Sequence, residues 1–435
     1  MSTGLNVRLS TMMFLQYAIW GAWLPILYPF LMGHRGFTLD QTGYCFMAGA
    51  VGAIIGPFIA GQVADRYFAT ERFLGISHLL GAVLVWVLAD TADFNSFLVL
   101  SGLYGLVYAP TLSLTNSLAF HHLPDRDRDF GRVRVWGTLG WIVVGIAVGQ
   151  WLRLYHTPEG TEAVVSAAQN AGRADAFKLS AIIGGVMGIY CFFLPHTPPS
   201  KEANENNAAF KALGAVRMQP LLTLFLLAVP MSCIHQFYFV HTTEFLSVLQ
   251  RNVASAKDLD ASINTIFGVG GSGLMTIGQV VEVAVLAVIP LVAKKVSRKS
   301  LLAVGITAYA ARMALFAYMG DSVAAVLLGV ALHGFCFGCF IFVAFMVVDE
   351  QTTPDIRASA QSLFNLVIIG VGIIVGSLVA TSVVGKIAME EVMVDGAKTS
   401  VMNYETLFSI PMWASIACLA LLLFFYPSRS PKVAA

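Results

Sequence analysis

The sequence has few charged residues for its length. Of its 435 residues only 12% are Asp, Glu, Lys or Arg, whereas an average soluble domain has roughly 25%. Hydrophobic residues make up 57% of the chain, and the mean hydropathy is +0.74. A water-soluble globular fold is therefore excluded, and most of the chain is expected to lie in a lipid bilayer.

The chain also lacks a strong net charge and a cysteine framework. Its formal net charge is +1, so no global field attracts nucleic acid. The six cysteines all lie in apolar stretches, which does not indicate disulfides or a metal cage. Cys336 and Cys339 form a C-x-x-C with no second pair and are interpreted as packing residues. We expect no metal, no cofactor and no nucleic-acid partner, and we expect a monomer.

Motifs of enzymatic catalysis are missing as well. The sequence contains no H-E-x-x-H, no paired aspartates and no convincing nucleophile with its base. The glycine-rich run at 268–273 fits G-x-G-x-x-G, but no βαβ pattern surrounds it, and it is interpreted as the flexible start of a helix. The sequence therefore predicts that the protein is not an enzyme.

Long apolar segments dominate the rest of the chain and predict an all-α membrane protein. Each is long enough to cross a bilayer, which takes about 20 residues. The expected spans are 11–33, 41–64, 73–91, 96–121, 132–153, 177–195, 219–247, 264–293, 300–319, 322–349, 357–385 and 404–427.

The only long polar stretch divides these twelve spans into two halves. It predicts an N-terminal six-helix bundle over 1–195, a cytoplasmic linker over 196–218 and a C-terminal six-helix bundle over 219–435. Lys and Arg are about twice as frequent in the loops on the N-terminal side of the membrane as in the opposite loops, so both termini are expected in the cytoplasm.

Charged residues within these spans are candidates for function, because a charge at the centre of a membrane helix costs about 3 kcal/mol. Glu282 lies three residues after Gln279, on the same helix face. A carboxyl group removed from water binds a proton more readily near neutrality. Glu282 is therefore a candidate proton carrier, and the alternative is a structural hydrogen bond to a neighbouring helix.

A second group of candidates lies in "RVWGTLGW". Arg134, Thr138 and Trp141 are spaced four and three residues apart, so a guanidinium, a hydroxyl and an indole form one stripe. Such a stripe suits a ligand with hydroxyl groups and a flat ring. The alternative is that Arg134 extends to the cytoplasmic interface beside Arg132.

Other polar residues lie in the seventh, ninth and tenth spans. "CIHQFYFVH" is unusually polar and aromatic for a membrane helix, and His235 and His333 are alternative proton relays. Arg312 is expected to be structural, pairing with a carbonyl or extending to the interface. The sixth span, taken as 177–195, leaves Arg173 in an outer loop.

"GQVADRYFATER" resembles the loop signature between helices two and three of the major facilitator superfamily, although Tyr67 and Phe68 stand where the family has glycine. The resemblance implies a gate built from Asp65, Arg66 and Arg72. Asp65 can pair with a basic side chain or with a helix N-terminus when the cytoplasmic side is shut. The alternative is a loop that only fixes orientation.

Five further segments resemble the bacterial nucleoside:proton symporters of that superfamily. They are "FLQYAIWGAWL", "YAPTLSLTNS", "RVWGTLGW", "GQVVE" and "PDIRASAQSLF". The resemblance implies twelve helices in two six-helix halves, with the nucleoside between them. It implies these substrate-binding positions: Arg134, Thr138, Trp141, Gln236, Phe239, Gln279, Glu282, His333 and Phe337. A family asparagine is replaced here by Phe239, and a helix-ten aspartate by Gly338.

We therefore expect an inner-membrane secondary transporter that imports nucleosides with protons by alternating access. Three alternatives remain at this point. The first is a transporter of another hydroxylated solute such as a sugar, and the second is a nucleoside facilitator without proton coupling. The third is a membrane enzyme or receptor that transports nothing.

Overall fold

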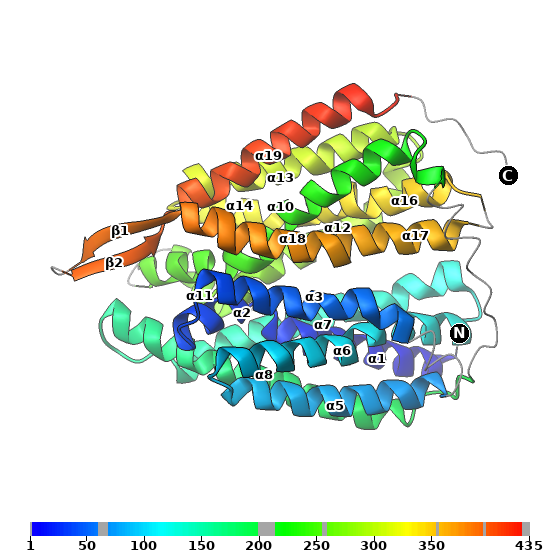
Figure 1. The fold of residues 1–435 in the computed structure, drawn as a ribbon. Coiled ribbons are helices and arrows are strands. Elements are labelled where there is room, and N and C mark those ends of the chain that lie inside the picture. Colours follow the sequence, from blue (N-terminus) through cyan, green and yellow to red (C-terminus); the bar gives the residue numbers. More distant parts are fainter. Residues whose placement is uncertain are drawn as a thin grey trace. The chain divides into compact units, whose positions relative to one another are not determined.

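The computed structural model describes residues 2–59, 68–198, 214–254, 259–353, 356–394 and 397–428. In this part of the chain, eleven helical stretches are long and apolar enough to cross a membrane. A further helix, α3 (Leu39–Ile59), coincides with the second predicted span and borders on residues outside the described part. The prediction of an all-α membrane protein is confirmed (Figure 1).

The chain divides into two compact units. The first contains Met1–Glu202 and Phe239–Thr276, and the second contains Ala203–Tyr238 and Ile277–Ala435. Two of the three boundaries therefore fall inside helices, α10 (Leu221–Asn252) and α12 (Ser272–Val292), and the third falls within the predicted linker. The six-plus-six division at the linker, over 196–218, stays a prediction.

The long helices of the first unit are α1 (Thr3–Trp23), continued by α2 (Leu27–Pro29) and η1 (Phe30–His34), then α3, α5 (Thr70–Asp90), α6 (Phe94–His122), α7 (Arg126–Tyr155) and α8 (Glu162–Cys191). They pack most closely in three pairs, α1 with α7, α3 with α6 and α5 with α8. Close pairs meet at small residues, as is common in membranes. A side chain at Gly140 of α7 would collide with the carbonyl of Phe14 in α1. The same holds for Gly52 of α3 against the backbone of Gly105 in α6.

The second half of α10 and the short helix α11 (Leu259–Phe267) complete the first unit. The glycine-rich run before α12 is indeed a helix start, because α12 begins at Ser272. Gly268 and Gly271 both have positive φ angles, and a side chain at either would strike the backbone of Gly149 or Thr243. Only glycine fits these two turns.

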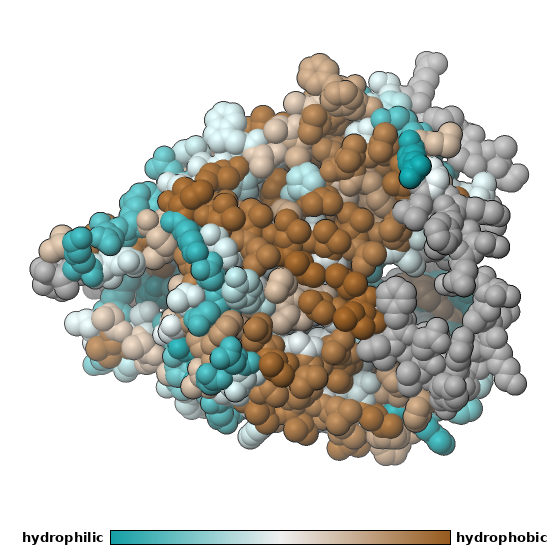
Figure 2. Space-filling model, in the orientation of Figure 1, coloured by the Kyte–Doolittle hydropathy of each residue, from teal (hydrophilic) through white to brown (hydrophobic). Residues whose placement is uncertain are grey.

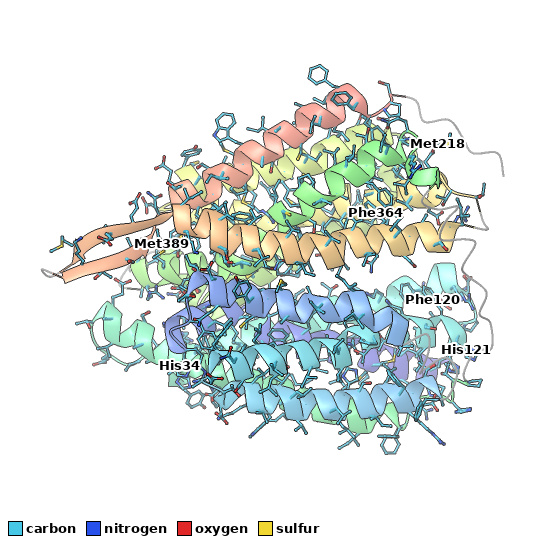
Figure 3. All side chains as sticks on the ribbon, in the orientation of Figure 1. His34, Phe120, His121, Met218, Phe364 and Met389 are labelled. Atoms are coloured by element: carbon cyan, nitrogen blue, oxygen red, sulfur yellow. The ribbon has the colours of Figure 1, made fainter. Side chains whose placement is uncertain are left out.

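The second unit contains the start of α10 and the helical elements from α12 onwards. They are α13 (Arg298–Tyr318), α14 (Val323–Ala331), α15 (His333–Phe335), η3 (Cys336–Phe342), α16 (Val343–Glu350), α17 (Arg357–Asn365), η4 (Leu366–Val371), α18 (Gly372–Leu378), η5 (Val379–Gly385) and α19 (Tyr404–Phe425). Phe364, labelled in Figure 3, is fully buried in this unit. Its ring packs edge-on against Phe225 and Phe345, at 5.0 and 5.1 Å between centroids.

Two features differ from the sequence predictions. The segment between η5 and α19 forms an antiparallel hairpin of β1 (Met389–Val394) and β2 (Ala397–Met402), visible in Figure 1. The sequence joining its strands is Asp-Gly, a dipeptide typical of two-residue hairpins. In addition, α8 begins at Glu162, fifteen residues or so before the predicted start. The prediction that Arg173 lies in a loop is therefore wrong.

The outward-facing side chains of the long helices suit a lipid environment. Figure 2 shows hydrophobic residues over the long helices and hydrophilic residues around the hairpin. Large apolar side chains such as Val83, Leu226 and Phe424 are exposed in the structure. In water such a surface would drive aggregation, whereas in a bilayer it contacts acyl chains.

Arg173 is the centre of a charged network inside the first unit. Its side chain is 0% exposed, and it pairs with Glu244 of α10 at 3.5 Å. It also donates to Asn170, and at longer distances to Ser247 and to the carbonyl of Gly270. Arg251 pairs with Glu244 at 3.2 Å on the other side. The network therefore attaches α8 to the end of α10 and the loop before α12.

We expect Glu244→Gln to lower the free energy of unfolding by about 3 kcal/mol, because it leaves the buried Arg173 guanidinium without its carboxylate. Thermal unfolding of the purified protein in detergent measures this as a lower melting temperature. The matched control is Glu162→Gln, since Glu162 pairs with Arg251 but is 66% exposed. The control should change stability by less than about 0.5 kcal/mol. Equal melting temperatures for the two variants would contradict the expectation.

Candidate functional site

The predicted stripe in the fifth span lies on one helix. Arg134, Thr138 and Trp141 are all in α7, and all three side chains are half-buried. The guanidinium of Arg134 stacks over the ring of Tyr17 in α1, 4.0 Å from its centroid. A side chain at Gly137 would collide with Tyr17 and approach Arg134, so this glycine leaves room for the stacked pair.

Trp141 belongs to an aromatic cluster in the first unit. Its ring lies edge-on to Trp20 of α1, with centroids 5.7 Å apart, and edge-on to Phe239 of α10, at 6.5 Å. Trp20 in turn lies 6.3 Å from Tyr108. Two predicted site residues, Trp141 and Phe239, are thus brought together. Trp141 is half-buried, and the face of its ring is of the kind on which a base stacks.

A buried polar cluster lies next to these aromatic residues in the first unit. The amide of Gln16 donates to Thr111 at 2.8 Å and contacts His78 at 2.8 Å through its oxygen. The hydroxyl of Tyr108 donates to the backbone carbonyl of Gln16 at 2.6 Å. These bonds join α1, α5 and α6 and fix the position of Tyr108 next to Trp20. Sequence reasoning did not find this cluster.

The second unit brings the predicted carboxylate and histidine together. Glu282 of α12 is 16% exposed, and its Oε2 lies 3.6 Å from Nε2 of the buried His333. A side chain at Gly334 would press on the backbone of Val281 and Glu282, so α12 and α15 lie in close contact at this level. The pair joins a carboxylate and an imidazole, two groups that can bind a proton, away from bulk water.

Gln279 and Gln236 provide amides in the same unit. Gln279 is buried, and its Oε1 has no hydrogen-bond partner in the part of the chain that the structure describes. An unused buried acceptor costs free energy, and a ligand donor would relieve that cost. Gln236 is also buried and donates from Nε2 to Ser377 of α18 at 3.1 Å. Gln236 is therefore held in place by a neighbouring helix.

Phe337 and Gly338 lie in η3, a π-helical segment within the tenth span. Such segments recur at functional sites. Phe337 is half-buried. A side chain at Gly338 would approach Cγ1 of Val285 to 2.6 Å, so a larger residue at this position would require Val285 to move. The carboxylate of Glu282 lies against this span, next to His333.

Arg312 does not lie where the sequence analysis expected it. Its side chain is 0% exposed, so it neither reaches an interface nor extends to water. The guanidinium lies over the rings of Tyr238 and Tyr309, 4.5 and 5.0 Å from their centroids. It contacts Nδ1 of His333 at 3.3 Å. Sequence reasoning could have found the arrangement from the spacing of Tyr309 and Arg312, which places both on one helix face.

Of the predicted gate, Asp65 and Arg66 lie outside the described residues. Arg72 lies in the first turn of α5 and is exposed. Within the described residues, no group of three or more His, Cys, Asp or Glu side chains is placed to hold a metal ion.

The sequence profile of the family described as nucleoside H+ symporter matches residues 1–430. The chain belongs to the nucleoside H+ symporter family. It is therefore a multi-pass membrane transporter that imports nucleosides with protons, and not an enzyme.

Relatives of this symporter in Escherichia coli K12 cover almost its whole length. A putative nucleoside transporter, YegT, is 29% identical over 96% of this chain and 93% of its own. Xanthosine permease is 27% identical over 97% of this chain and 95% of its own. A crystal structure of the nucleoside transporter NupG superposes with a TM-score of 0.79, at 21% identity, covering 97% of this chain and 100% of that one. This last match shows the shared major facilitator fold.

Proposed function

We propose that two sets of side chains, one in each unit, act on the transported nucleoside. In the first unit, Trp141 and Phe239 supply a surface for the base, and Arg134 and Thr138 supply hydrogen-bond donors. The cluster of Trp141, Trp20 and Phe239 supports this assignment, because three edge-on rings form a rigid apolar wall.

In the second unit we propose that amides and aromatic residues complete recognition. Gln279 accepts a hydrogen bond from a hydroxyl or amino group through its unpartnered Oε1. Gln236 and Phe337 add a fixed amide and an aromatic ring. His333 contributes both to substrate contact and to the environment of Glu282.

We propose that Glu282 carries the transported proton. The observation that supports this most strongly is its position 3.6 Å from the buried His333, at 16% exposure, in a helix of the membrane. An ionised carboxylate in such surroundings costs free energy unless a proton or a substrate group binds to it. Protonation and substrate binding are therefore linked.

Gating and orientation belong to the same proposal. Asp65, Arg66 and Arg72 close the cytoplasmic side, as the loop signature implies. The distribution of Lys and Arg supports an inner-membrane protein with both termini in the cytoplasm. We also propose that it works as a monomer and binds no nucleic acid.

The proposal predicts uptake of purine or pyrimidine nucleosides by proteoliposomes carrying an inward proton gradient. A panel of labelled nucleosides, including xanthosine because of the relative named for it, is compared with free bases and with sugars such as xylose. Nucleoside uptake should be competed by other nucleosides and abolished by a protonophore. Uptake of sugars in preference to nucleosides would overturn the assignment of Trp141 and Phe239 to a base.

A further inference from the structure

Arg312 is a buried cation without a carboxylate partner. In the described residues its only polar contact is with His333, and its Nε and Nη2 have no hydrogen-bond partner. Two tyrosine rings lie against its guanidinium and offset part of the cost of burial. A fully buried arginine at this level of a membrane helix is expensive, and such residues usually serve a function.

The contact with His333 fixes which ring nitrogen carries a proton. Arginine has only donors, so Nη1 of Arg312 must donate to Nδ1 of His333 over the 3.3 Å that separates them. An imidazole that accepts at Nδ1 is neutral and carries its proton on Nε2. That nitrogen is the one that lies 3.6 Å from Oε2 of Glu282.

We propose that Arg312 is the positioning residue of the proton site: it holds His333 in the tautomer that presents Nε2–H to Glu282 and supplies the positive charge that balances the ionised carboxylate. The inference rests on the proposed role of Glu282 as proton carrier.

Other titratable groups surround this site and belong to the same electrostatic environment. His235 stacks on His333 at 5.3 Å between ring centroids and bonds to the hydroxyl of Tyr309 at 2.7 Å. Tyr238 stacks on His333 at 4.5 Å. His235 and Tyr238 of α10 and Arg312 of α13 therefore lie against His333, and Tyr309 of α13 and Cys336 of η3 lie near these residues in turn.

The first test uses Arg312→Gln. Loss of the positive charge favours the protonated form of Glu282, so the pH at which nucleoside uptake falls to half should rise by about one unit. Substrate exchange, measured by counterflow without a gradient, should persist. Arg312→Lys restores the charge and should return the midpoint toward the wild-type value.

The matched control is Arg298→Gln on the same helix. Arg298 pairs with Glu350 and does not contact His333, so this variant should keep the wild-type midpoint. A wild-type pH profile in Arg312→Gln, together with normal exchange, would show that Arg312 only fills space.

A second measurement needs no change at Arg312 and decides the question if Arg312→Gln does not fold. Nitrogen NMR of histidine-labelled protein, with the His333 signals assigned by their loss in His333→Gln, should show an unprotonated Nδ1 and a protonated Nε2. The opposite tautomer would overturn the inference.

These tests separate the inference from the proposed function. If Glu282→Gln keeps wild-type accumulation, the role of Glu282 is wrong, whatever the state of His333. If Glu282→Gln loses accumulation but Arg312→Gln keeps the wild-type midpoint, the role of Glu282 stands and only the role of Arg312 is wrong.

Discussion

Glu282→Gln is expected to abolish proton-driven accumulation of nucleoside while leaving exchange of nucleoside across the membrane intact. Glutamine has nearly the shape of a protonated glutamate and keeps hydrogen-bonding groups, but it cannot release a proton. At about 100 mV, one co-transported proton supplies about 2.3 kcal/mol, enough for about 50-fold accumulation. The variant should lose this factor completely. Accumulation and counterflow of labelled nucleoside in the same proteoliposomes measure the two activities.

The matched control for this experiment is Glu350→Gln, which makes the same change in a residue paired with Arg298 and distant in sequence from the proposed site. It should accumulate nucleoside like the wild type. If Glu282 only binds a hydroxyl of the substrate, Glu282→Gln will lower affinity and the remaining transport will still collapse with a protonophore. Wild-type, protonophore-sensitive accumulation in Glu282→Gln would falsify the assignment and direct attention to His333 or His235.

The helices were predictable because each depends on a local property, the length of an apolar run. Spans such as 404–427 and 322–349 correspond closely to α19 and to the helical stretch Val323–Glu350. The prediction failed where polar residues lie within a helix. The first half of α8 contains Asn170, Arg173 and Asp175, and its sequence is typical of a loop. Burial of Arg173 against Glu244 makes that helix possible, and such a long-range contact leaves no local signal.

The sequence predicted that some candidate residues share a helix face, but it did not predict which side chains they contact. Spacing placed Arg134, Thr138 and Trp141 on one face, and α7 confirms that placement. Spacing could not show that Tyr17 lies beneath Arg134, since the two are joined only by the packing of α1 on α7. Arg312 failed for the same reason. Its burial depends on Tyr238 and His333, which belong to other helices.

Replacing Arg134 is expected to have the other large effect. Arg134→Ala should weaken nucleoside binding by about 10-fold to 100-fold, because a hydrogen bond from a charged donor contributes about 1.5–3 kcal/mol. The fold should survive, since the guanidinium is half-buried and its contact is with the face of Tyr17 rather than with a buried carboxylate. Calorimetry on purified protein measures affinity, and thermal unfolding checks the fold.

The role of Tyr17 gives this experiment its control. Tyr17→Phe keeps an aromatic face under the guanidinium, 4.0 Å away in the wild type, and should keep nearly wild-type affinity. Tyr17→Ala removes the face, so Arg134 becomes free to sample other rotamers and binding should fall to an intermediate level, at a cost of about 1 kcal/mol. The ordering of the three variants is the decisive result, because it distinguishes an oriented donor from a charge that merely lies nearby. Wild-type affinity in Arg134→Ala would remove α7 from the substrate site and leave Arg134 as a residue whose function is to pack α7 on α1.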